Sequence, residues 1–179
     1  MRRNKKGAAI WVSAVLYMAL GLVAITLVLS AAVPLINKIR DKNTFIQTKE
    51  LFFQMDENVK KVASEGPGSR RVLSPLEVSK GNLTIDTTNE KILWSLTTNN
   101  KMMEPDIVFR EGPVNMELKQ SIIEDEYVIN LELNYTGFTD LEFSENIQYG
   151  NPFIGTYSMT IEHGGFNDED LPIVSINMI

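Results

Sequence analysis

A run of 29 residues, from Ala8 to Ile36, contains no charged side chain and constrains the fold of this 179-residue chain more than any other feature. As an α-helix rising about 1.5 Å per residue, the run would reach roughly 43 Å, more than the ~30 Å hydrocarbon core of a bilayer. A cleaved secretory signal has an apolar stretch of about 7–15 residues before a small-residue site, and here only Ser30-Ala31-Ala32 offers one. We therefore predict a retained helix over residues 8–36 that crosses a membrane once.

Basic residues flank this run unequally and predict its orientation. Four precede it, namely Arg2, Arg3, Lys5 and Lys6. Three follow it closely, namely Lys38, Arg40 and Lys42, and Asp41 partly offsets them. Because cytoplasmic flanks carry the excess of Lys and Arg, we expect a cytoplasmic N-terminus and an extracellular C-terminal domain.

The remainder of the chain is acidic and lacks cysteine. Without the four leading basic residues it has 13 basic against 23 acidic side chains. Such a balance offers no electrostatic footprint for nucleic acid, so we expect no nucleic-acid partner. The absence of cysteine excludes disulfides, thiolate metal sites and cysteine nucleophiles.

The junction Lys5-Lys6-Gly7-Ala8 places a basic pair and a glycine directly before the apolar run. It resembles the class III signal peptides of archaeal type IV filament subunits, which include archaellins and type IV pilin-like proteins. The resemblance implies that a membrane prepilin peptidase removes residues 1–7 by cutting between Gly7 and Ala8. It also implies that the freed helix packs with copies of itself or related subunits, so that we expect a homo- or hetero-oligomer.

Two positions depart from patterns found in this superfamily. Val12, the fifth mature residue, occupies the place of a glutamate in bacterial pilins, and Ile10 occupies a position where archaellins often have glycine. These departures favour an archaeal-type subunit or a minor pilin-like protein over a major bacterial pilin.

A second, amphipathic helical segment is predicted over residues 37–65. Phe45, Phe52 and Val59 recur every seven residues, with Met55 between them at helical spacing. This apolar stripe either covers the sheet of the chain's own domain, which we favour, or contacts neighbouring subunits. Gly66-Pro67-Gly68 predicts the end of the helix and opens a linker over residues 66–71.

Particular residues of the apolar run are candidates for helix packing. Small side chains permit close approach between helices in a membrane or bundle. Those singled out are Ala14, Gly21, Ala24 and Ala31. Pro34 removes one backbone donor near the outer edge of the run and predicts a kink there.

The period changes to two after Arg71, which predicts an extracellular β-rich domain over residues 72–179. Alternating residues on both sides of Glu124-Asp125-Glu126 indicate a long antiparallel hairpin. Further strands are predicted at 83–87, 91–98, 107–110, 155–162 and 173–178, with a turn at Gly164-Gly165. We expect an α+β protein in which a long N-terminal helix precedes an antiparallel, β-sandwich-like head.

No catalytic, cofactor-binding or metal-binding constellation emerges, so we expect no enzyme, no cofactor and no small-molecule substrate. His163 is predicted to be a surface histidine in a turn, and the acidic stretch from Asn167 to Asp170 a solvated loop that lacks the spacing of a calcium loop. Asn82 and Asn134 head N-x-Thr sequons on the outer side and are candidate glycosylation sites.

The sequence is compatible with two functions. One is a pilin-like structural subunit, major or minor, of an archaeal type IV filament or related surface assembly. The other is a permanently anchored extracellular β-domain that binds a ligand, a glycan or a partner protein.

Overall fold

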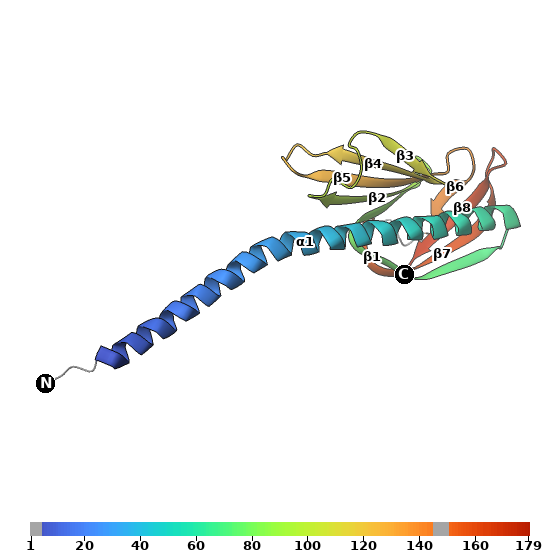
Figure 1. Cartoon of the computed structure of the whole chain (residues 1–179). Coiled ribbons are helices and arrows are strands. Elements are labelled where there is room, and N and C mark those ends of the chain that lie inside the picture. The colour runs from blue at the N-terminus through green and yellow to red at the C-terminus, as the bar shows by residue number, and fades with distance from the viewer. Residues whose placement is uncertain (1–4, 145–150) are drawn as a thin grey trace. The chain divides into compact units, whose positions relative to one another are not determined.

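The computed structural model describes residues 5–144 and 151–179, with side chains from residue 11 onward. One helix, α1 (Lys5–Glu65), precedes eight strands in the part of the chain that is described (Figure 1). The strands are β1 (Arg70–Asp86), β2 (Lys91–Thr98), β3 (Val108–Glu111), β4 (Val114–Gln120), β5 (Tyr127–Asn134), β6 (Asp140–Phe143), β7 (Phe153–Phe166) and β8 (Pro172–Met178). The predicted fold class, a long helix followed by a β-rich head, is confirmed.

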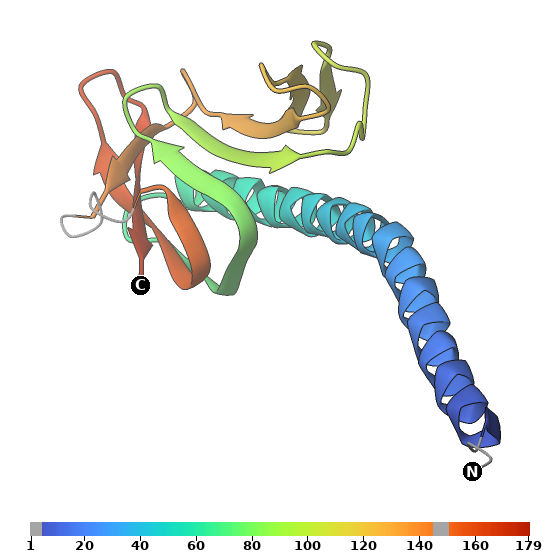
Figure 2. The same cartoon turned by 90° about the vertical axis from the view of Figure 1, so that its left-hand side faces the viewer.

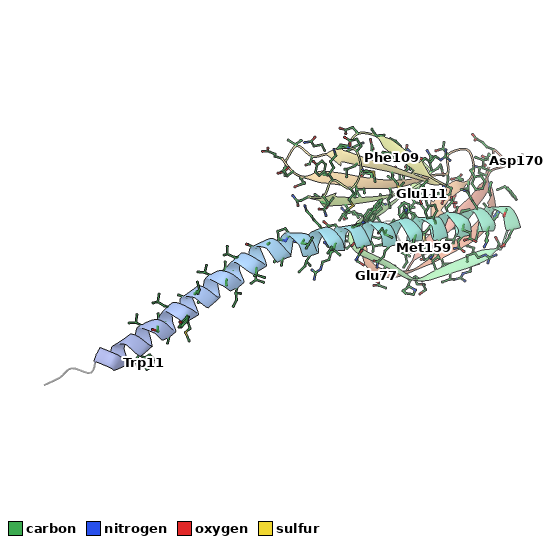
Figure 3. All side chains as sticks on the ribbon, viewed as in Figure 1. Trp11, Glu77, Phe109, Glu111, Met159 and Asp170 are labelled. Atoms are coloured by element: carbon green, nitrogen blue, oxygen red, sulfur yellow. The ribbon has the colours of Figure 1, made fainter. Side chains whose placement is uncertain are left out.

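The chain divides into two compact units, Met1–Arg40 and Asp41–Ile179. In the first unit, every side chain from Trp11 to Ile36 is exposed except the half-buried Ala32. Figure 3 shows side chains that project from the apolar segment of the helix, which begins near the labelled Trp11. The helix is long and apolar enough to cross a membrane. The helix continues through Pro34.

The second unit, which we call the head, contains the last part of α1 and a single sheet of order β3-β4-β5-β2-β1-β7-β8-β6. Neighbouring strands are antiparallel except β6 and β8, which are parallel. Strand β1 joins two groups, since its residues 70–78 pair with β7 and its residues 82–86 pair with β2. Figures 1 and 2 show these groups on different sides of the C-terminal part of α1, with β1 bending from one to the other.

Gly81 lies at the bend of β1, where the register with β7 shifts. Its φ is +78°, and an added Cβ would lie 2.5 Å from the Ser95 carbonyl oxygen and 2.6 Å from Trp94 Nε1. Only glycine adopts this conformation at so close an approach without cost. The bend therefore depends on the absence of a side chain at this position.

The core fills the space between the sheet and α1. Phe52, Met55, Val59 and Val62 of the helix are fully buried. The core also includes inward residues of neighbouring strands that pair directly with one another. For example, Leu131 of β5 pairs with Trp94 of β2 on one side and with Met116 of β4 on the other. The favoured interpretation of the apolar stripe, as core of the chain's own domain, is thus correct from Phe52 onward.

Several strand predictions need correction. Strand β1 begins at Arg70, inside the predicted linker, and β6 was not predicted at all. Gly164-Gly165 is not a turn but an irregular register within β7, whose pairing with β8 shifts between His163 and Gly165. The β4–β5 hairpin is confirmed, with Asp125 in the left-handed region at a φ of 59°.

Candidate functional site

The exposed apolar segment of α1, residues 11–36, contributes no residue to the core of the head. Ala14, Gly21, Ala24 and Ala31 are all exposed in it. At 3.6 residues per turn these four positions fall within an arc of about 100° on one side of the helix. A Cβ added at Gly21 would meet nothing within 4 Å. This small-residue face thus has no packing role within the described chain and is free for another helix.

The predicted processing junction lies at the start of α1. The helix begins at Lys5, so the backbone of Lys5, Lys6, Gly7 and Ala8 is helical. Residues 1–4 and the side chains of residues 5–10 lie outside the described part of the chain. Cleavage after Gly7 stays a prediction.

The outer part of α1 is bound to the head by its apolar stripe. Phe52, Met55 and Val59 are completely buried, and Phe45 is partly buried against the same core. Ile46, on a neighbouring row of the helix, remains 39% exposed. These stripe residues serve the fold of the head and are not available to a neighbouring subunit.

A polar cluster that the sequence did not single out fixes α1 where it enters the head. Asp41 is 9% exposed, and it accepts hydrogen bonds from Lys80 Nζ through Oδ1 and from Thr98 Oγ1 through Oδ2, each at 2.8 Å. Trp94 Nε1 donates to the Lys80 carbonyl oxygen at 3.0 Å, which continues the network into the core. Helix, β1 and β2 thereby share one buried carboxylate.

The outer face of the sheet carries a hollow of about 450 Å³ formed by β1 to β5. Its polar lining includes amides, carboxylates and one ammonium group. The polar residues concerned are Asn82, Thr84, Ser95, Asn115, Glu117, Lys119, Asn130 and Glu132. The other lining residues are apolar, namely Leu93, Trp94, Val108, Met116 and Leu131. Hydrogen-bonding groups beside apolar side chains suit a ligand that has both polar and apolar surface.

Both sequon asparagines are exposed. Asn82 borders the outer-face hollow on β1, and Asn134 is the last residue of β5. The Asn134 side-chain oxygen accepts a hydrogen bond from Thr136 N at 2.9 Å. Neither position buries its side chain, so both can accommodate a glycan, and their modification stays a prediction.

A second hollow, of about 750 Å³, lies beside Asn134 and is lined by Glu90 and Asp140 among others. Burial raises the pKa of Glu90, and the neighbouring Asp140 adds to this, although Leu141 N donates to Glu90 Oε2 at 2.7 Å. Neighbouring Asn167 accepts hydrogen bonds from Glu169 N and Leu171 N, each at 2.9 Å. Hydrogen bonds from the loop's own backbone N–H groups to the Asn167 side chain therefore hold the acidic loop.

The prediction that His163 is a surface residue is wrong. Its side chain lies in β7 and is only 3% exposed, because Gly164-Gly165 continues the strand instead of turning it. His163 Nδ1 accepts from Gly165 N at 3.0 Å, and the ring packs edge-on against Phe166 at a centroid distance of 5.1 Å. Within the described ranges, no cluster of three or more His, Asp or Glu side chains is placed to hold a metal ion.

Comparisons with protein-family models, with curated protein sequences and with solved structures found no match to this chain.

Proposed function

We propose that this chain is a pilin-like structural subunit of an archaeal type IV filament or a related cell-surface assembly. The observation that carries the proposal is the exposed apolar segment Trp11–Ile36, from which the head takes no core residue. A membrane can hold that segment first, and neighbouring subunits can hold it later. In the proposed mature protein, residues 1–7 have been removed by a prepilin peptidase and the helix begins at Ala8.

The small-residue face supports helix association. Ala14, Gly21, Ala24 and Ala31 would let a neighbouring helix approach closely, as small residues do in membrane and bundle interfaces. The apolar residues around them suit lipid and a helix bundle equally. In this proposal the N-terminus is cytoplasmic before assembly and the head is extracellular.

The mature N-terminus tests the proposal. We expect mass spectrometry of membranes and sheared surface material to find Ala8 as the first residue. Gly7→Val should block processing and assembly, whereas the matched control Gly21→Ala should be processed normally, since its added Cβ meets nothing within 4 Å. Surface material that starts at Met1 would contradict the proposal.

Self-association is tested separately by crosslinking. The chain has no cysteine, so single cysteines placed at Ala14, Gly21 or Ala31 provide unique reaction sites. A filament subunit should give ladders of oligomers in native membranes. A cysteine at Ile46, on the exposed side of the helix within the head, provides a comparison outside the apolar segment.

The outer-face hollow favours a second candidate, an anchored β-domain that binds a polar ligand such as a glycan. Glu117 and Glu132 line that hollow beside Asn130. This candidate predicts processing-independent binding that Glu132→Ala weakens in glycan-binding assays, and monomers in the crosslinking experiment. Binding unaffected by Glu132→Ala would argue against this site.

A further inference from the structure

The sequon that begins at Asn82 lies at the border of the outer-face hollow. Asn82 and Thr84 both line the hollow, whereas Leu83 between them is fully buried. Because the side chains of a strand alternate between the two faces of its sheet, both polar side chains of the sequon point to the outer face. Asn82 is exposed, and among the described residues its side-chain amide has no hydrogen-bond partner that a glycan would have to displace.

A polar row leads from Asn82 across the outer face. Asn82 pairs with Ser95 of β2, which pairs with Asn130 of β5. Asn130 pairs in turn with Glu117 of β4. Three strand spacings of about 4.8 Å make this row roughly 14 Å long. Strand β7 offers Asn82 no partner on the other side, because the register between β1 and β7 shifts at this point. A glycan on Asn82 therefore starts at one end of a row that runs into the hollow.

The charges around the hollow are balanced, which suits a neutral ligand. Glu117 Oε2 forms an ion pair with Lys119 Nζ at 3.1 Å. Glu132 Oε2 forms one with Lys91 Nζ at 3.2 Å. Neutral sugars present hydroxyl groups that hydrogen-bond to amides and carboxylates, and C–H faces that pack on apolar side chains such as Leu93. The hollow therefore matches a neutral glycan in both charge and polarity.

Covalent attachment would make even a weak contact effective. A ligand joined to its site by a short flexible linker has an effective concentration in the millimolar range. A hollow that binds the free sugar with a Kd of about 1 mM would therefore be at least half occupied by the attached one. The volume of about 450 Å³ lies within the range of small-molecule sites, roughly 300–1,000 Å³.

We propose that Asn82 carries an N-linked glycan and that the first sugars of this glycan occupy the outer-face hollow of the same chain. The inference rests on an extracellular head, which both candidate functions share, and it requires neither cleavage after Gly7 nor assembly. It differs from the second candidate function, in which the same hollow binds a ligand from outside. A glycan held in the hollow would cover Ser95, Asn130 and Glu117 and exclude such a ligand.

The first test is peptide mass spectrometry of the full chain, isolated from the membranes of the cells that naturally produce it. We expect a glycan mass on the peptide that contains Asn82. Asn134 in the same sample is the internal control, because its sequon is modified only if the head is exported. An unmodified Asn82 would overturn the proposal. A glycan on Asn134 alone would do so while still placing the head outside the cell, and would leave the filament proposal intact.

The second test measures how fast mild periodate oxidises the sugars on Asn82, in a detergent without a sugar headgroup. We expect oxidation in the folded chain to be at least about fivefold slower than in the chain unfolded by urea, the factor that one net hydrogen bond provides. Asn130→Ala, at the centre of the row, should lose most of this protection. The matched control Thr97→Ala, exposed on the same face but outside the hollow, should retain it.

Equal oxidation rates in the folded and unfolded chain would overturn the proposal. Equal protection in the Asn130→Ala and Thr97→Ala variants would also overturn it, because the hollow would then not hold the sugars. Protection that decreases when the chain is diluted would assign the contact to the glycan of another copy, which is again contrary to the proposal.

Discussion

Replacement of Asp41 by alanine tests whether one buried carboxylate holds α1 to the head. Thr98 donates a hydrogen bond to this charged acceptor from a buried position, and such bonds contribute about 1.5–3 kcal/mol. The Lys80 side chain is 44% exposed, so its ion pair with Asp41 adds only about 0.2–1 kcal/mol. Asp41→Ala should therefore lower the free energy of unfolding by about 2–4 kcal/mol.

The assay is urea unfolding of the full chain in detergent micelles, followed by tryptophan fluorescence. The chain has two tryptophans, so a Trp11→Phe background leaves the buried Trp94, whose indole donates to the Lys80 carbonyl oxygen, as the reporter. In this background Lys80→Ala should cost no more than about 1 kcal/mol. A loss below about 0.5 kcal/mol for Asp41→Ala, or an equal loss for Lys80→Ala, would refute the assignment of the stabilisation to the buried Thr98 bond.

Three further predictions concern the head and use the same unfolding measurement. Phe52→Ala, which empties a fully buried position, should lower the free energy of unfolding by about 3–5 kcal/mol. Ile46→Ala, at a position 39% exposed, should lower it by about 1 kcal/mol or less. Equal losses for the two variants would contradict the assigned core. Gly81→Ala should lower the free energy of unfolding by about 2–4 kcal/mol because the added Cβ has no space. Gly66→Ala should lower it by only about 1–2 kcal/mol, since φ is also positive there but nothing lies within 4 Å of the added Cβ. Similar losses for the two variants would show that the bend tolerates a side chain. Burial raises the pKa of Glu90 in the folded state, so the folded chain retains that proton to a higher pH than the unfolded chain, and this contribution to stability falls as pH rises through the interval between the two values. Glu90→Gln should remove that dependence, so the substitution should stabilise the head more near pH 7 than near about pH 4. An unchanged pH profile of the free energy of unfolding would contradict the assignment.

Local patterns were sufficient for the features that repeat over several turns or residues. The seven-residue spacing of Phe45, Phe52 and Val59 predicted the helix that packs against the sheet. The alternation of apolar and polar residues predicted the β4–β5 hairpin. Gly66-Pro67-Gly68 correctly indicated where α1 ends, since the last helical residue is Glu65.

Features that depend on distant partners could not be predicted in this way. The first half of β1 exists because β7 pairs with it, and Gly81 within β1 looks like a strand break in the sequence. Strand β6 has four residues and forms only against the end of the chain, in parallel with β8. His163 resembled a turn residue because two adjacent glycines follow it, and such pairs are typical of turns. In the structure these glycines continue β7, with an irregular register against β8.

The candidate sites divide in the same way. The apolar segment and its small residues were evident from composition alone. Asp41 resembled an ordinary charge after a membrane span, and its role depends on Lys80, 39 residues later.

The order of strands determines when the head can complete its fold during synthesis. Strand β1 is the first to emerge after α1, yet one of its two partners, β7, begins only at Phe153. Until that residue has been synthesised, half of β1 has an unsatisfied edge and the stripe around Phe52 lacks part of its cover. A nascent chain halted before this point would expose both to other proteins. Folding of the head should therefore be sensitive to truncations that remove β7 or β8.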